Sequence, residues 1–289
     1  MTISPKLIAY LEEDIAGGDI TTSVIVPKGK TSAFIIAKED GIIAGMSEAK
    51  DIFNYCGADA EIRKPDGSRV AKGDIVMDIS GDSHAVLIAE RTALNIIGRM
   101  SGIATKTARI SAKIKKINPR CNVAGTRKTS PGFREYDKKA IALGGGDPHR
   151  YNLSDAFLIK DNHLELCTVA DAVAKAKAFS VYKKVEIEVE NTADALAAAA
   201  AGADIIMFDN MTPEMIKSTI AALSEKYLGK GITIEVSGGI REDNVTDYVI
   251  AGVDRISMGE LTHSVKNFDV SLDVKPAIKT VNLVKTVKI

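Results

Sequence analysis

A repeated succession of strand, turn and helix in the second half of the chain restricts its fold more than any other feature. Four short runs, residues 185–190, 204–208, 232–236 and 254–258, are rich in β-branched and apolar residues. Helical segments separate them, with Asn191 and Pro213 as expected starts and Gly202 as an expected stop. This order predicts either a (β/α) barrel or a doubly wound parallel sheet.

The first hundred residues have a different pattern. Strand-like runs at 32–37, 61–64 and 75–79 occur with helical segments at 7–13 and 49–55. We expect an N-terminal α+β sandwich domain over residues 1–103 and an α/β catalytic domain over residues 104–269. A long helical region covers 85–116, with a break expected near Ser101 and Gly102, and with Arg99 as a solvated side chain.

Positively charged side chains gather between residues 125 and 163. They are Arg127, Lys128, Arg134, His149, Arg150, Lys160 and His163. Because they stand among glycines and turn residues, they do not form one face of a helix. A solvated surface is the ordinary explanation of such a cluster. However, the apolar run 156–159 places Lys160 at the end of a buried strand, so we favour a binding site for a polyanionic substrate.

Carboxylates follow or occupy the strands of the α/β domain. Glu186, Glu188 and Glu190 share one face of their strand, because side chains alternate with a period of two. That face either meets solvent or points inward, and an inward face requires cations or a metal ion as partners. Both faces of a barrel strand are covered, so we favour the inward face. Asp209, after the next strand, can then join Glu188 in holding Mg²⁺.

A glycine-rich segment follows the strand at 232–236. Ser237, Gly238 and Gly239 precede a helix that is expected from Arg241 to Gly252. Backbone N–H groups at such a position suit a phosphate. Gly259 stands at the end of the next strand, and loops near the end of a barrel commonly form its phosphate site.

The composition excludes some classes of partner. Lysine plus arginine number 38, and aspartate plus glutamate also number 38, so no global positive field attracts nucleic acid. Three scattered cysteines predict neither a disulfide framework nor a zinc site. No uninterrupted apolar run has membrane-spanning length. We therefore expect a cytoplasmic protein that binds neither nucleic acid nor membrane.

The order and spacing of these motifs resemble those of the quinolinate phosphoribosyltransferase family. Each motif alone is weak, but the ordered set is specific and covers nearly the whole chain. The segments are residues 13–22, 90–95, 126–129, 131–132, 149–150, 159–163, 185–190, 208–210, 237–239 and 259–264.

The resemblance implies an activity and a fold. A phosphoribosyl group would pass from 5-phosphoribosyl-1-pyrophosphate to quinolinate, giving nicotinate mononucleotide, pyrophosphate and CO₂ in NAD biosynthesis. The fold would be that of a type II phosphoribosyltransferase, an incomplete (β/α) barrel that lacks one of the usual eight strands. Residues 270–289 would return to the N-terminal sandwich. The active form would be a homodimer or higher oligomer, in which Arg91 reaches the site of a neighbouring subunit.

The resemblance also implies roles for the cations. Arg127, Arg150 and Lys160 would hold the two carboxylates of quinolinate. His149 would help them, and Lys128 would neutralise the pyrophosphate. An arginine fork suits the first of these tasks, because it can bind carboxylate oxygens in a bidentate manner.

The ribose and phosphate side of the site is implied in the same way. Glu188 and Asp209 would place Mg²⁺ and the ribose hydroxyls. The 5-phosphate would lie against residues 237–239 and Gly259, with His263 nearby. We expect catalysis to depend on four side chains. They are Lys128, Lys160, Glu188 and Asp209.

Two other functions remain open from the sequence. One is a phosphoribosyltransferase of the same fold that acts on nicotinate or another monocarboxylate without decarboxylation. The number of cations favours a dicarboxylate but does not prove it. The other is a barrel that binds phosphometabolites without catalysis. The presence of both Glu188 and Asp209 argues against this second function, because binding alone does not require carboxylates for a metal.

Overall fold

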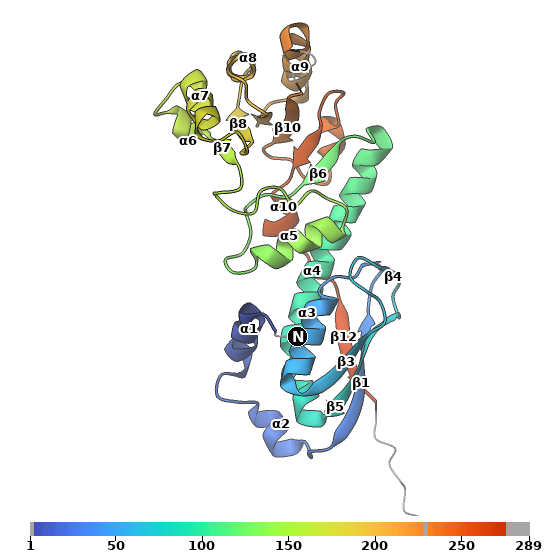
Figure 1. Ribbon diagram of the computed structural model, residues 1–289. Helices are drawn as coiled ribbons and strands as arrows, with labels where there is room; N and C mark the ends of the chain where they lie inside the picture. Colours follow the sequence, from blue (N-terminus) through green and yellow to red (C-terminus); the bar gives the residue numbers. More distant parts are fainter. Residues whose placement is uncertain (1–2, 228–230, 276–289) are drawn as a thin grey trace, which may run out of the picture. The chain divides into compact units, whose positions relative to one another are not determined.

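The computed structural model describes residues 3–227 and 231–275, which form two compact units (Figure 1). The first unit runs to Gly98 and resumes at Phe268, and the second spans Arg99–Asn267. The long helix α4 (Ser83–Ile117) contributes to both units. The expected domain boundary after residue 103 therefore falls inside a continuous helix, whereas the contacts divide the chain at Gly98.

The first unit is an antiparallel sheet with helices, as expected for an α+β domain. The strand order is β12-β1-β5-β3, with a separate pair β2-β4. The strands are β1 (Lys30–Ala37), β2 (Gly41–Ile42), β3 (Ala58–Ile62), β4 (Arg69–Val70), β5 (Ile75–Asp82) and β12 (Val270–Val274). The helices are α1 (Pro5–Ile15), α2 (Ile20–Ile25) and α3 (Met46–Cys56). Alternate β1 residues, Ala33, Ile35 and Ala37, are buried, which gives the sheet one core face.

The last described strand comes from the far end of the chain. β12 pairs antiparallel with β1, and Figure 1 shows it in orange beside the blue β1. In register, Ile35 faces Leu272. The sequence resemblance implied that residues 270–289 return to this domain. Residues 276–289 lie outside the described part of the chain.

The second unit contains a six-stranded parallel sheet. Its order is β6-β11-β10-β9-β8-β7. The strands are β6 (Asn122–Ala124), β7 (Phe157–Ile159), β8 (Val185–Val189), β9 (Ile205–Asp209), β10 (Thr233–Ser237) and β11 (Arg255–Ser257). The helices that follow them are α5 (Arg134–Leu143), α6 (Asp161–Leu164), α7 (Val169–Phe179), α8 (Thr192–Ala201), α9 (Pro213–Tyr227) and α10 (Glu260–His263).

The strand order decides between the two folds that the sequence allowed. The first strand of the unit, β6, pairs with the last, β11, and the strands between follow in sequence order. This is the order of a barrel, whereas a doubly wound sheet changes direction near its first strand. The incomplete barrel is thus confirmed. Within the described residues, the sheet has six strands, and an isolated bridge between Ala124 and Asp147 lies beside β6. Pro148 follows at once and has no N–H to extend that bridge into a strand.

Local signals account for several helix ends. The Asn191 side chain accepts a hydrogen bond from the backbone N–H of Asp194, and Gly202 ends α8 with a φ of 90°. Pro213 is the first residue of α9, as predicted. The prediction of a helix from Arg241 to Gly252 is wrong, because only one 3-10 turn, η1 (Val245–Tyr248), forms there.

Asn244 explains that missing helix. Its side chain accepts a hydrogen bond from the N–H of Arg241 at 2.7 Å and donates one to the carbonyl of Gly239 at 3.2 Å. These local bonds compete with the helical ladder. The same bonds tie the segment after β10 to the glycine-rich loop.

Two predictions about α4 are also wrong. The helix continues without a break through Gly102. A Cβ at Gly102 would lie 2.2 Å from the carbonyl oxygen of Lys266, so this glycine allows two backbone segments to approach closely. Arg99 is not solvated. Its guanidinium binds both carboxylate oxygens of the buried Asp137, at 2.8 and 2.9 Å, and lies over the ring of Phe133.

The buried apolar residues of the barrel strands determine which way the polar side chains on the same strands point. Ile187, Val189, Phe208, Val236 and Ile256 are buried with at most 2% exposure. Their burial fixes the direction of the alternate side chains on the same strands. Among the described helices, none is both long enough and apolar enough to cross a membrane.

Candidate active site

A pocket of about 350 Å³ opens at the carboxyl ends of the barrel strands. It is lined by Gly125, Thr126, Arg127, Lys128, His149, Arg150, Leu158, Lys160, Glu188, Met207, Asp209, Ser237 and Ser257. Most of these residues end a strand or follow one closely, whereas Leu158, Glu188 and Met207 lie within strands, and His149 and Arg150 lie on a separate loop. That loop follows Asp147, which is bridged to β6. Barrels of this class place their binding sites at this end.

The pocket brings together most of the cations and carboxylates that the sequence singled out. Arg91 lies on the part of α4 that belongs to the first unit, and its side chain is exposed. Arg134 lies outside the pocket lining, donating to Thr129 and to the carbonyl of Tyr151. His163 accepts a hydrogen bond from the backbone N–H of Lys160 at 2.9 Å, which agrees with a structural role.

The arginines of the pocket form its most positive part. Burial lowers the pKa of Arg150, and the charge of Arg127 lowers it further, because the two guanidinium groups lie near each other. Both stay charged at neutral pH. Within the described residues, the buried Nε of Arg127 has no hydrogen-bond partner. Two adjacent guanidinium groups with unused donors suit an anionic substrate with planar carboxylates.

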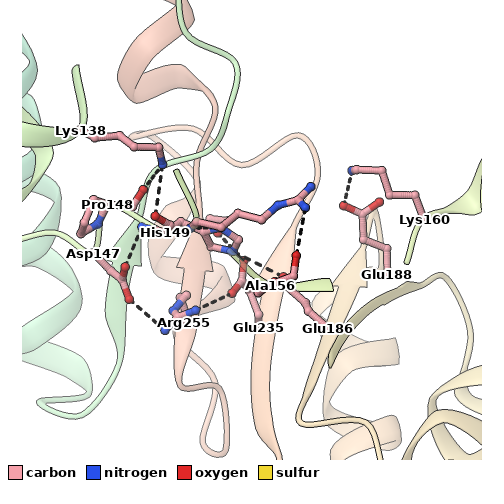
Figure 2. Close-up of polar contacts among 12 residues, drawn as sticks. Lys138, Asp147, Pro148, His149, Ala156, Lys160, Glu186, Glu188, Glu235 and Arg255 are labelled. Carbon is pink, nitrogen blue, oxygen red and sulfur yellow. Dashed lines mark hydrogen bonds and ion pairs between the residues drawn. The ribbon is translucent and has the colours of Figure 1, made fainter. Parts of the chain in front are cut away.

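A lysine and two carboxylates lie on the opposite strands of the pocket. Lys160 Nζ is 2.6 Å from Glu188 Oε1, as Figure 2 shows. Asp209 ends β9 and accepts a hydrogen bond from the side chain of Asn210. Glu188 is largely covered, with 16% of its side chain exposed. The predicted inward face of β8 is confirmed for Glu186 and Glu188, whereas Glu190 is exposed.

Lys128 lies against the loop that follows β11. A Cβ at Gly259 would be 3.0 Å from Lys128 Cδ and 3.0 Å from His263 Cδ2. The hydroxyl of Thr262 donates to the backbone carbonyl of Lys128 at 2.8 Å. Gly259 therefore leaves room for Lys128 and His263 to lie side by side.

The glycine-rich loop after β10 is shaped by the neighbouring strand end. Gly238 and Gly239 have φ values of 92° and 63°, which favour glycine. A Cβ at Gly238 would lie 2.5 Å from the backbone nitrogen of Asn210, so glycine is required there by space as well. Because no long helix follows this loop, a helix dipole does not contribute to anion binding here. The backbone N–H groups of the loop are the donors available to an anion.

Beneath the pocket lies a buried network that the sequence reasoning missed. His149 Nε2 is 3.4 Å from Glu186 Oε1 and 3.4 Å from Glu235 Oε1 (Figure 2). Arg255 binds Glu235 and Asp147, at 3.3 and 2.8 Å. Ser257 donates to Glu235. The alternation on β10 contained the signal, because Glu235 shares a strand face with Ser237.

Burial and neighbouring charges both shift the pKa values of the groups in this network. Burial lowers the pKa of His149, but the carboxylates of Glu186 and Glu235 raise it more strongly, to about 9. Burial raises the pKa of Glu186. A group of one histidine and two carboxylates within 4.8 Å also has the composition of a metal site.

Lys138 is a second buried residue that the sequence reasoning missed. It lies on α5, and its ammonium group donates to the backbone carbonyls of Pro148 and His149 (Figure 2). Burial lowers its pKa to about 8, and the charge of Arg134 contributes. Its position in the sequence, on an ordinary amphipathic helix, gives no sign of this contact.

Known proteins resemble this chain over most of its length. The model of the quinolinate phosphoribosyl transferase N-terminal domain matches residues 19–101, and that of the C-terminal domain matches residues 103–273. A probable nicotinate-nucleotide pyrophosphorylase (carboxylating) from Methanocaldococcus jannaschii is 45% identical over 91% of this chain and 94% of its own. One from Archaeoglobus fulgidus is 42% identical over 89% and 98%. The crystal structure of NadC from Streptococcus pyogenes superposes with a TM-score of 0.87 at 36% identity, over 95% of this chain and 99% of that one.

Proposed function

The chain belongs to the quinolinate phosphoribosyltransferase family, and we propose that the pocket at the strand ends of its barrel is where this reaction takes place. The enzyme transfers a phosphoribosyl group from 5-phosphoribosyl-1-pyrophosphate to quinolinate, with release of pyrophosphate and CO₂, and forms nicotinate mononucleotide for NAD synthesis. One observation supports this pocket as the active site. Arg127, Arg150 and Lys160 converge with Glu188 and Asp209 in a single pocket.

Quinolinate binds on the cationic side of this pocket. Its two carboxylates are held by Arg127, Arg150 and Lys160, whose donors point from separate loops. The unpartnered Nε of Arg127 supports this assignment, because a buried donor without an acceptor is costly until a ligand supplies one. Quinolinate also competes with Glu188 for Lys160, and so it separates the present ion pair.

Phosphoribosyl pyrophosphate binds on the opposite side. Glu188 and Asp209 hold the ribose hydroxyls and Mg²⁺, for which hard carboxylate oxygens in a partly open pocket are suitable ligands. When bound, Mg²⁺ neutralises charge on the pyrophosphate. Lys128 adds a positive charge on that side. The 5-phosphate lies against the backbone of residues 237–239 and Gly259, with His263 beside Lys128.

Catalysis depends on position and charge. As the bond from ribose to pyrophosphate breaks, positive charge develops on the ribose, and the pyridine nitrogen attacks carbon 1. Lys128 stabilises the negative charge of the leaving pyrophosphate. The positive charge of the new pyridinium ring then stabilises the carbanion that remains when the adjacent carboxylate leaves as CO₂, and a proton adds to that carbon. No protein base is required for these steps.

We also propose the assembly and the compartment. Arg91 is exposed on α4, and in a homodimer or higher oligomer it completes the quinolinate site of a neighbouring subunit. The three cysteines, Cys56, Cys121 and Cys167, are free thiols, which supports a reducing compartment such as the cytoplasm.

A coupled assay tests the function directly. The purified protein is supplied with phosphoribosyl pyrophosphate and Mg²⁺ together with either quinolinate or nicotinate, and CO₂ and nicotinate mononucleotide are measured in the same sample. We expect equal amounts of both products from quinolinate and little nucleotide from nicotinate. If nucleotide forms from nicotinate and no CO₂ is released, the protein is instead a phosphoribosyltransferase that acts on a monocarboxylate. Omission of Mg²⁺ with a chelator tests the proposed metal in the same experiment, with loss of turnover as the expected result.

A further inference from the structure

Thr262 holds the main chain of Lys128 in place. Its hydroxyl donates to the backbone carbonyl of Lys128 at 2.8 Å, whereas its distance to the carbonyl of Gly259 is longer, at 3.3 Å. The residue is 2% exposed, so water does not compete for this hydroxyl. Lys128 follows β6, and Thr262 lies on α10, 134 positions later in the sequence. The bond therefore joins two segments that approach each other only in the folded chain.

Arg99 binds the main chain of Thr262. One nitrogen of its guanidinium, Nη2, donates to the backbone carbonyl of Thr262 at 3.1 Å. The same nitrogen and Nε bind the two carboxylate oxygens of Asp137, at 2.9 and 2.8 Å. The side chain of Asp137 is fully buried, and that of Arg99 is 21% exposed. Because the guanidinium is planar and its bond to the carboxylate is bidentate, Asp137 fixes the direction in which Arg99 reaches Thr262.

Asp137 connects these contacts back to the segment that carries Lys128. It lies in the first turn of α5, and its N–H donates to the carbonyl of Phe133 at 3.0 Å. The guanidinium of Arg99 lies over the ring of Phe133, 5.4 Å from its centre. The segment from Lys128 to Phe133 is thus held at both ends.

The side chain of Lys128 extends from this fixed main chain across the loop that follows β11. A Cβ at Gly259 would lie 3.0 Å from Lys128 Cδ, so the lysine stem lies directly against the glycine. Lys128 also lines the pocket. Because a lysine side chain is long and flexible, the position of its ammonium group depends on the position of its main chain. A small shift of that main chain would move the ammonium group away from a bound pyrophosphate.

We propose that Arg99, Asp137 and Thr262 are positioning residues, which hold the main chain of Lys128 so that its ammonium group binds the pyrophosphate. In the described part of the chain, the pocket lining includes none of the three, so they act through Lys128. The inference rests on the proposed function in one respect, because it assumes that Lys128 stabilises the leaving pyrophosphate. The sequence predicted a different role for Arg99, that of a solvated side chain.

Two substitutions at Thr262 separate its hydroxyl from its packing. Thr262→Val keeps the shape of the side chain and removes the donor to Lys128, whereas Thr262→Ser keeps the donor and removes a buried methyl group. We expect T262V to lower kcat about tenfold with the KM for quinolinate within about twofold of the wild type, and T262S to keep kcat within about twofold. An equal fall of kcat in both variants would mean that packing and not the hydroxyl matters, and would refute the proposal.

The effect of T262V should disappear when the lysine side chain is absent. In a Lys128→Ala background, T262V should change kcat by less than about twofold, because the hydroxyl acts through that side chain. An equal fall in both backgrounds would show that Thr262 acts independently of Lys128. Thr219→Val is the matched control, since Thr219 is also buried and its hydroxyl bonds to that of Thr192 at 2.7 Å, outside the pocket. T219V should unfold at a lower urea concentration than the wild type and keep its kcat.

Arg99→Lys tests the contact on the other side of Thr262. Lysine keeps a positive charge beside Asp137, but a single ammonium group does not reproduce the fork that also reaches the carbonyl of Thr262. We expect R99K to lower kcat about fivefold or more, and to have no such effect in the Lys128→Ala background. A kcat equal to that of the wild type would refute the role of Arg99.

Binding of inorganic pyrophosphate gives a reading that does not depend on turnover. With Mg²⁺ present, calorimetry should show a Kd for pyrophosphate raised about tenfold in T262V and within about twofold of the wild type in T262S and T219V. An unchanged Kd in T262V would overturn the inference. A wild-type protein whose pyrophosphate binding depends on Lys128, but which makes no nicotinate mononucleotide from quinolinate, would instead refute the proposed function.

Discussion

At the scale of single residues, Arg150 is the side chain on which the choice of substrate most depends. Its guanidinium lies in the pocket beside Arg127 and bonds to the carbonyl of Ala156 at 3.5 Å. Of the interactions proposed for quinolinate, a paired arginine fork is the most demanding in geometry. Loss of this group should therefore affect quinolinate and spare the second substrate.

We expect Arg150→Ala to lower kcat/KM for quinolinate by about a hundredfold or more, because a buried charged hydrogen bond is lost. Binding of phosphoribosyl pyrophosphate, measured by calorimetry, should be largely unchanged. Arg120→Ala is the matched control, since Arg120 precedes β6 and lies at the opposite end of the strands. Undiminished turnover in R150A would refute the assignment of the carboxylate site.

At the scale of elements, two loops of the pocket are tied to each other and to α4. The backbone N–H of Glu242, after β10, donates to the carboxylate of Glu260, after β11, at 3.0 Å. From α4, Arg109 and Lys113 bind Glu242, and Lys106 binds Glu260 at 2.9 Å. The helix thus supports both loops that are proposed to hold the 5-phosphate.

Acid should weaken this connection. The hydrogen bonds from Arg109 lower the pKa of Glu242 from its ordinary 4.5 to about 2, and Lys113 contributes. A carboxyl whose pKa is lower in the folded state stabilises the fold above pH 4.5, and this stabilisation is lost as the pH falls toward 2. Because the partners Arg109 and Lys113 are exposed, solvent screens these ion pairs, and we expect the contribution of Glu242 at neutral pH to be only about 1 kcal/mol.

The variant Glu242→Gln measures that contribution. Urea unfolding at neutral pH should show a loss of about 1 kcal/mol, and the difference from the wild type should shrink when the titration is repeated near about pH 3. Glu225→Gln, on the exposed face of α9, is the control and should have little effect at either pH. A difference that is constant with pH would mean that the ionised carboxylate is not what holds the loops.

At the scale of the whole molecule, the proposed oligomer makes a quantitative prediction. If each site combines Arg150 of one subunit with Arg91 of its neighbour, the variants R91A and R150A should each be nearly inactive. In a mixed dimer of the two, one site is intact and the other lacks both arginines. Random reassembly makes half of the dimers mixed, so activity should recover to about a quarter of the wild-type value.

Subunit exchange and a coupled assay check this expectation. The two purified variants are unfolded and refolded together, and turnover is compared with that of each variant refolded alone. Activity that stays at the level of the separate variants would show that Arg91 acts within its own subunit or not at all.

The sequence determined the features that depend on neighbours along the chain. Alternation on β8 placed Glu186 and Glu188 on one face, and Asn191, Gly202 and Pro213 marked helix ends, because caps and side-chain periodicity are local properties of the backbone. The parallel strands that these patterns indicated also placed the charged residues at one end of the sheet. The fold class and most of the pocket lining could be predicted on this basis.

Tertiary structure decided what depends on residues far apart in the sequence. The pairing of β6 with β11 selected the barrel, and the approach of Lys266 required Gly102 within a continuous helix. Asp137 forms an ion pair with Arg99, which lies 38 positions earlier in the sequence. Glu235 and Arg255 joined the network beneath His149 only because β10 and β11 lie side by side. No local pattern predicts such contacts, since their free energy depends on burial and on partners that only the folded chain brings together.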